Sequence, residues 1–117
     1  MRKRSPARLR KLLAQRQEWL DEMATLSLIV RGSFFERFST CSRAHCACHK
    51  GARHGPRAYV AVTEGKVQRQ HFVRKGQVAA VKRGVGQYRR LLVLARRITR
   101  INLELMRLGA LSGTEAP

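Results

Sequence analysis

The chain has 117 residues, a length that suits one domain, and it contains no run near the roughly 18 apolar residues that a membrane-spanning helix needs. Its 25 lysines and arginines stand against 7 acidic residues, for a formal net charge of +18. Such self-repulsion opposes a compact fold unless a polyanion neutralises it. The composition therefore favours nucleic acid as the partner over an anionic membrane surface, and we expect a cytoplasmic protein without a signal peptide.

The first predicted element is a helix that follows a basic arm at residues 1–4. Ser5 is a preferred N-cap residue, and Pro6 suits the first helical position. Apolar residues then recur at the three- and four-residue steps of an amphipathic helix. These observations predict a helix over residues 6–26, with the apolar positions Leu9, Leu12, Leu13, Trp19, Leu20, Met23 and Leu26.

The middle of the chain reads as extended structure around an irregular segment. Residues 33–39 form either a short strand or an extended approach to the first cysteine, and residues 41–56 are irregular. Residues 59–62 and 67–73 predict an antiparallel hairpin, whose turn uses Gly65 to supply a positive φ.

Two aromatic residues of this hairpin allow two interpretations. Tyr59 and Phe72 can stack on nucleic-acid bases or pack in the core of the hairpin. Aromatic residues are only 6% of the chain, so we expect both in the core and expect the protein to contact the nucleic-acid backbone.

A long helix is predicted over residues 77–108, followed by a disordered tail at 109–117. One apolar stripe on this helix is expected to pack on the first helix and the hairpin, and comprises Val78, Val81, Val85, Tyr88 and Leu92. A second stripe points largely away from the first at about 100° per residue, and comprises Leu91, Leu94, Ile98, Ile101, Leu105 and Leu108. We expect Leu94, Ile98, Ile101 and Leu105 to form a protein–protein or homodimer interface.

The three cysteines lie close together, with three histidines among and just after them. Residues 41–56 hold Cys41, Cys46 and Cys48 together with His45, His49 and His54, and glycines allow the chain to bend around one ion. Zinc prefers four such ligands in a tetrahedron. The preferred set is Cys41, Cys46, Cys48 and His54, with His49 as the alternative fourth ligand. A closed shell with no neighbouring acid predicts structural rather than catalytic zinc. The sequence shows neither an acid pair nor a nucleophile–base set, so we do not expect an enzyme.

Cations are concentrated on the long helix and around the predicted zinc loop. Lys82, Arg89, Arg96, Arg100 and Arg107 fall in a sector about 40° wide on a helical wheel, with few acids near enough to pair with them. Such a row can be an ordinary solvated face, but uncompensated like charges favour a polyanion partner. The full predicted nucleic-acid-binding set is Arg43, Lys50, Arg53, Arg57, Lys66, Arg69, Lys82, Arg89, Arg96, Arg100 and Arg107.

The segment from Arg31 to Leu108 resembles an uncharacterised bacterial family of small basic proteins. The shared features are an Arg-Gly-Ser opening, the C-x4-C-x-C pattern, His-Gly-Pro, a tyrosine, a hairpin and a long basic helix. In this chain they are Arg31-Gly32-Ser33, Cys41, Cys46, Cys48, His54-Gly55-Pro56 and Tyr59. The resemblance favours His54 over His49 as a zinc ligand. Members look like companions of mobile genetic elements, which favours DNA over RNA; His45 stands where the family often has glycine.

The sequence thus predicts an α+β fold with one zinc-stabilised domain at residues 5–108. Its elements are an N-terminal helix, a zinc-binding loop, a two-stranded antiparallel hairpin and a long C-terminal helix packed antiparallel on the first. The expected function is non-enzymatic binding to the phosphate backbone of nucleic acid. The alternatives are an accessory subunit that docks on a larger enzyme such as a transposase or nuclease, and an RNA- or ribosome-associated protein.

Overall fold

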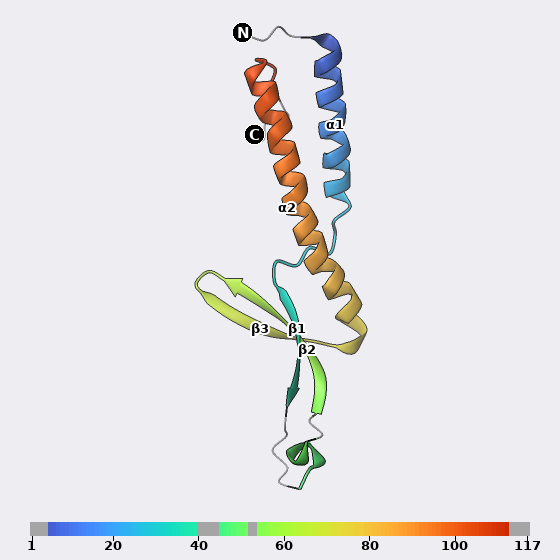
Figure 1. Cartoon of the computed structure of the whole chain (residues 1–117), viewed down its shortest axis with the longest axis vertical. Helices are drawn as coiled ribbons and strands as arrows, with labels where there is room; N and C mark the ends of the chain where they lie inside the picture. Colours follow the sequence, from blue (N-terminus) through green and yellow to red (C-terminus); the bar gives the residue numbers. More distant parts are fainter. Residues whose placement is uncertain (1–4, 40–44, 52–53, 113–117) are drawn as a thin grey trace. The chain divides into compact units, whose positions relative to one another are not determined.

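The structure is a computed structural model that describes residues 5–39, 45–51 and 54–112. In chain order it contains helix α1 (Pro6–Ala24), strand β1 (Ser33–Ser39), the short 3-10 helix η1 (Ala47–Lys50), strands β2 (His54–Glu64) and β3 (Val67–Val73), the 3-10 turn η2 (Lys75–Gln77) and helix α2 (Val78–Arg107). The fold is α+β, as predicted (Figure 1). The chain divides into two compact units: a helical unit of Met1–Ser27 with Arg89–Pro117, and a sheet unit of Leu28–Tyr88. Helix α2 contributes residues to both units.

Helix α1 begins where the sequence predicts. Ser5 caps it, because its side-chain oxygen accepts a hydrogen bond from the backbone N–H of Arg8, and Pro6 occupies the first turn. The helix ends at Ala24, two residues before the predicted end, where the Thr25 hydroxyl donates a hydrogen bond to the Glu22 carbonyl.

The helical unit is an antiparallel pair formed by α1 and the C-terminal part of α2 (Figure 1). Arg8, near the start of α1, bonds Glu104 near the end of α2, whereas Glu22, near the end of α1, bonds Arg90. The buried Leu12 of α1 packs in a cluster with three buried residues at the C-terminal end of α2 and just beyond it, Ile101, Leu105 and Leu108. The predicted antiparallel packing of the two helices is therefore present.

This packing corrects the prediction of an exposed leucine stripe for a partner. Leu94 and Leu105 are 0% exposed and Ile101 is 6% exposed, while Ile98 is half-buried. The apolar stripe of α1 needs a covering surface, and the second stripe of α2 provides it within the same chain. Three of these four side chains are thus core residues rather than a docking surface.

The sheet has three antiparallel strands in the order β1-β2-β3, which corrects the predicted two-stranded hairpin. The expected hairpin is present, with Gly65 at φ 66° between β2 and β3. However, β2 begins at His54 rather than residue 59, and β1 pairs along its other edge, with Phe35 opposite Tyr59. Glycine at position 55 permits the longer β2 for two reasons. Its φ of 137° is one that other residues rarely adopt, and a Cβ at this position would lie only 3.0 Å from the carbonyl oxygen of Arg37.

One face of this sheet, the inner face, packs on the first turns of α2. Ala58, Val60 and Val73 are buried there, and Val78 and Val81 of the helix pack against them. These two valines belong to the first predicted apolar stripe, whose packing on the hairpin is confirmed. Leu92 of the same stripe is 47% exposed, so the stripe does not continue into the core at that residue.

The contact between α2 and the chain before β1 depends on a glycine. The backbone N–H of Val30 donates a hydrogen bond of 3.0 Å to the carbonyl of Gly84. A Cβ at residue 84 would overlap the carbonyl oxygen of Leu28, so the helix can approach this segment only without a side chain there. In the described part of the chain, no helix is long and apolar enough to cross a membrane.

Candidate nucleic-acid interface

The predicted basic row on α2 is solvent-exposed in the helical unit. Arg89, Arg96, Arg100 and Arg107 are all exposed, and they span about 27 Å of helix at 1.5 Å per residue. No described carboxylate forms an ion pair with any of the four. The row lies on the part of the helix surface that Leu94, Ile101 and Leu105 do not occupy. It is therefore a line of uncompensated positive charge.

Acidic residues of the helical unit are instead used between the helices. The guanidinium of Arg90 donates to Glu22, with 2.7 Å from Nη2 to Oε1, and it lowers the pKa of that carboxyl through this hydrogen bond and its charge. Arg8 donates to both carboxylate oxygens of Glu104, at 2.7 and 2.8 Å. These two bidentate pairs join α1 to α2, and no carboxylate in the described ranges forms an ion pair with the basic row.

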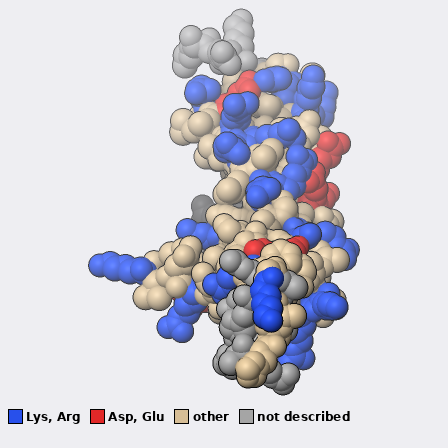
Figure 2. All heavy atoms as spheres, turned by 60° about the horizontal axis from the view of Figure 1, so that its bottom comes forward, with Lys and Arg blue, Asp and Glu red and all other residues tan. Residues whose placement is uncertain are grey.

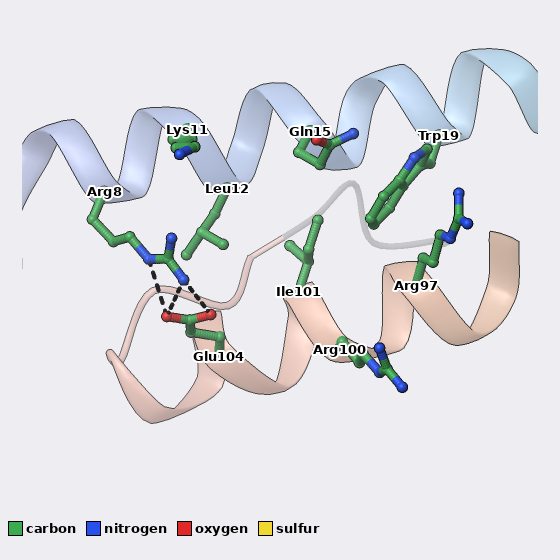
Figure 3. Close-up of a pocket in the computed structure, with 9 residues that line it drawn as sticks. All are labelled: Arg8, Lys11, Leu12, Gln15, Trp19, Arg97, Arg100, Ile101 and Glu104. Carbon is green, nitrogen blue, oxygen red and sulfur yellow. Dashed lines mark hydrogen bonds and ion pairs between the residues drawn. The ribbon is translucent and has the colours of Figure 1, made fainter.

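A groove between α1 and α2 adds further cations to this unit (Figure 3). Its volume is about 370 Å³, and Arg8, Lys11, Arg97 and Arg100 line it together with Trp19. The guanidinium carbon of Arg97 lies 5.6 Å from the centre of the Trp19 ring, a cation–π distance. Arg97 and Trp19 thus form one wall of a groove whose rim is basic.

The sheet unit carries the remaining described cations of the predicted set. Lys50, Arg57, Lys66, Arg69 and Lys82 are all exposed, while Arg43 and Arg53 lie outside the described residues. Arg69 is the member with a nearby carboxylate, 3.8 Å from Glu64, and Lys82 lies 4.9 Å from the centre of the Phe34 ring. Figure 2 shows that lysine and arginine side chains cover much of the visible face, with acidic side chains in a few small groups.

The outer face of the sheet, opposite the buried valines, holds a row of three aromatic side chains, one from each strand. Phe35 stacks on Tyr59 with ring centres 5.5 Å apart, and Phe72 meets Tyr59 edge-on at 5.9 Å. The expectation that Phe72 is a core residue is wrong, since it is 60% exposed, and Tyr59 is half-buried. Sequence alternation places residues 59 and 72 on one face but does not tell which face α2 covers.

Two arginines border this aromatic row. The guanidinium carbon of Arg37 lies 4.7 Å from the centre of the Tyr59 ring, and its Nη2 lies 3.5 Å from Oε1 of Gln70. A hydrogen bond from Arg37, with smaller contributions from its charge and from Arg57, lowers the pKa of the Tyr59 hydroxyl. Arg37 and Phe35 were not predicted as site residues, because their place beside Tyr59 depends on the pairing of β1 with β2.

The predicted zinc ligands lie largely outside the described part of the structure. Cys41 is not described, and the side chains of Cys48, His54 and the alternative His49 are not described either. Cys46 is half-buried and immediately precedes η1. Among the described residues no cluster of metal ligands occurs, so the structure does not test the coordination. The backbone does pair Ser39 with His54, which brings the two ends of the cysteine segment together.

Comparisons with known proteins identify a family but no activity. A family model described as Domain of unknown function (DUF6788) matches residues 9–83. No curated protein and no solved structure matches the chain. The matched segment includes α1 from Leu9 onward, the cysteine segment and the whole sheet, and it ends within the first turns of α2.

Proposed function

We propose that this chain, which belongs to the DUF6788 family, is a non-enzymatic, zinc-stabilised protein that binds the phosphate backbone of nucleic acid. The observation that carries the proposal is the exposed basic row of α2, which has no acidic partner among the described residues. Ion pairs at Arg8 and Arg90 are satisfied inside the fold, whereas Arg89, Arg96, Arg100 and Arg107 face solvent. Four like charges on one helical surface destabilise a free helix and are neutralised by phosphates.

Zinc has a structural role in this proposal. The paired residues Ser39 and His54 fix the two ends of a loop that contains three cysteines, a donor set that zinc binds readily. Cys41, Cys46, Cys48 and His54 would hold the ion, and the ion would order the segment that carries Arg43, Lys50 and Arg53. The resemblance to companions of mobile elements favours DNA over RNA as the ligand.

The decisive experiment measures how binding to a DNA duplex depends on salt. In the variant Arg89→Gln/Arg96→Gln, two phosphate contacts are lost. Since each contact contributes about 0.9 to the slope of log K against log salt, we expect the slope to become shallower by about 1.8. The same titrations with an RNA duplex decide between DNA and RNA as the preferred ligand.

The matched control changes the net charge equally at another place. Ala7→Glu/Ala14→Glu adds two carboxylates at exposed positions of α1 and leaves the basic row intact. We expect a much smaller change of slope than for the arginine variant. Equal slopes for the wild type and the arginine variant would show that the row does not contact phosphates.

The accessory-subunit alternative was based on the second apolar stripe of α2, which is largely buried. Leu94, Ile101 and Leu105 are buried, the last two in the cluster with Leu12 of α1, and are not available to a docking enzyme. Binding to a larger enzyme would have to use a different surface, whereas the basic row remains exposed for a polyanion.

A further inference from the structure

We infer that the outer face of the three-stranded sheet is a stacking platform for unpaired nucleic-acid bases. This inference deepens the proposed function, on which it rests, because it assigns single-stranded segments as the ligand of the sheet unit. The platform comprises Phe35, Tyr59 and Phe72, bordered by Arg37, Arg57 and Gln70.

The three aromatic side chains lie on the outer face of the sheet. A sheet in an α+β fold buries one face, and here Ala58, Val60 and Val73 form that buried inner face. Phe72 lies on the opposite face and is 60% exposed. The aromatic row is therefore separate from the core cluster. Its three rings, one from each strand, contact one another and form a continuous surface on the outer face. Every base offers a flat π-face that such rings bind without regard to sequence.

The two faces of the sheet differ in charge. The strand register places the acidic residues Glu36 and Glu64 on the inner side, with Ala58 and Val67 as their partners. Strand alternation gives the outer face the described residues Ser33, Phe35, Arg37, Arg57, Tyr59, Ala61, Thr63, Gln68, Gln70 and Phe72. This set contains cations and amides but no carboxylate. The charged residues that this face carries are Arg37 and Arg57, and an acidic side chain of the inner side, Glu36, lines a pocket with Arg57 and Phe72. The aromatic face itself is therefore complementary to bases joined by phosphates.

Arg37 extends the aromatic row with a planar cation. Its guanidinium carbon lies 4.7 Å from the centre of the Tyr59 ring, so a flat, charged group sits next to the aromatic row. Arginine planes stack on bases in RNA-binding proteins, and their N–H groups bind phosphates. The amide of Gln70 is within 3.5 Å of the same guanidinium and provides donors and acceptors for a base edge.

The test separates base stacking from phosphate binding. The probes are a fluorescent 12-nucleotide oligothymidylate, an abasic oligonucleotide of the same length and charge, and a DNA duplex. We expect the wild type to bind oligothymidylate about tenfold more tightly than the abasic strand, as one or two stacked bases would give. In Phe72→Ala this difference should shrink about tenfold, while the salt dependence stays unchanged because no phosphate contact is lost.

Two further variants guard against misfolding and nonspecific loss. Phe38→Ala removes another phenylalanine of the sheet, 55% exposed and outside the aromatic row, and should retain the preference for bases. Phe72→Trp keeps a stacking ring, so it should retain the affinity, and oligothymidylate should quench additional tryptophan fluorescence relative to the wild type. Retained binding by Phe72→Trp with loss in Phe72→Ala supports the platform.

The outcomes also distinguish this inference from the proposed function. If the wild type binds the abasic strand as tightly as oligothymidylate, the platform is refuted, while phosphate binding by the protein stands. If none of the three probes binds and the RNA duplex of the salt titrations does not bind either, the proposed function itself fails. If Phe72→Ala leaves all affinities unchanged but converts a dimer to a monomer in sedimentation, a second copy of the chain covers the face and the inference is wrong.

Discussion

Arg90 of α2 and Glu22 of α1, 68 positions apart in the chain, form a bidentate ion pair at the end of the helical unit. The Nη2 to Oε1 distance is 2.7 Å, and both side chains are partly exposed. The pair aligns the last turn of α1 with α2, next to the position where the exposed row begins at Arg89. It also makes the stability of the helical unit depend on a carboxylate.

This pair predicts how acid destabilises the protein. The hydrogen bond from Arg90 lowers the pKa of Glu22 below its ordinary value of 4.5. The folded state therefore holds the proton less strongly than the unfolded state, so the contribution of the pair is complete above the ordinary pKa and is lost as pH falls below it. We expect Glu22→Gln to flatten the decrease of Tm with falling pH in thermal melts.

A second carboxylate of the same helix provides the control for this prediction. Glu18 accepts a hydrogen bond from Gln15 within α1 and does not join the helices. Glu18→Gln should retain the acid sensitivity of the wild type. An identical pH profile for Glu22→Gln and Glu18→Gln would contradict a special role for the pair.

The leucine stripe of α2 gives a prediction about stability rather than partner binding. Leu105 is fully buried, so Leu105→Ala should lower the free energy of unfolding by about 2–5 kcal/mol in urea titrations. Leu92→Ala, at a position 47% exposed, should change it by no more than about 0.5 kcal/mol. Because the contact lies within one chain, the midpoints should not depend on protein concentration. A concentration-dependent midpoint would restore the interface that the sequence suggested.

Local signals in the sequence predicted the helices well. Ser5 and Pro6 mark the start of α1, and Gly65 marks the hairpin turn, because caps and turns depend on a few neighbouring residues. Non-local contacts were harder to infer. The pairing of β1 with β2 depends on residues about twenty positions apart, which no local pattern encodes.

The candidate sites show the same division between local and non-local information. The exposure of the basic row on α2 follows from helical periodicity, and the described cations of the predicted set are indeed exposed. The exposure of Phe72 depends instead on which sheet face receives Val78 and Val81, and alternation along a strand is the same for either choice. The contact between Arg37 and Tyr59 can likewise be inferred only once the pairing of β1 with β2 is known.

The zinc hypothesis predicts a difference between two histidines. We expect one zinc per purified chain by elemental analysis, and we expect His54→Ala to lose it while His49→Ala retains it. His54 begins β2 opposite Ser39, at the closed end of the cysteine loop, so its loss should also lower Tm. Removal of zinc by a chelator should give the same decrease in Tm for the wild type. Retention of one zinc by both single variants would contradict His54 as a ligand.

Two glycines of α2 should respond oppositely to the same substitution. Gly86 is exposed, and an added Cβ there meets nothing within 4 Å, so Gly86→Ala should stabilise the protein by about 0.5–1 kcal/mol through helix propensity. Gly84 is buried, and an added Cβ would overlap the Leu28 carbonyl oxygen and lie near Val30. Backbone atoms cannot move away as a side chain can, so Gly84→Ala should destabilise by at least about 1–3 kcal/mol. Urea titrations of both variants measure the two values, and a stabilising Gly84→Ala would mean that α2 does not approach residues 28–30 as closely as the hydrogen bond from Val30 to Gly84 requires.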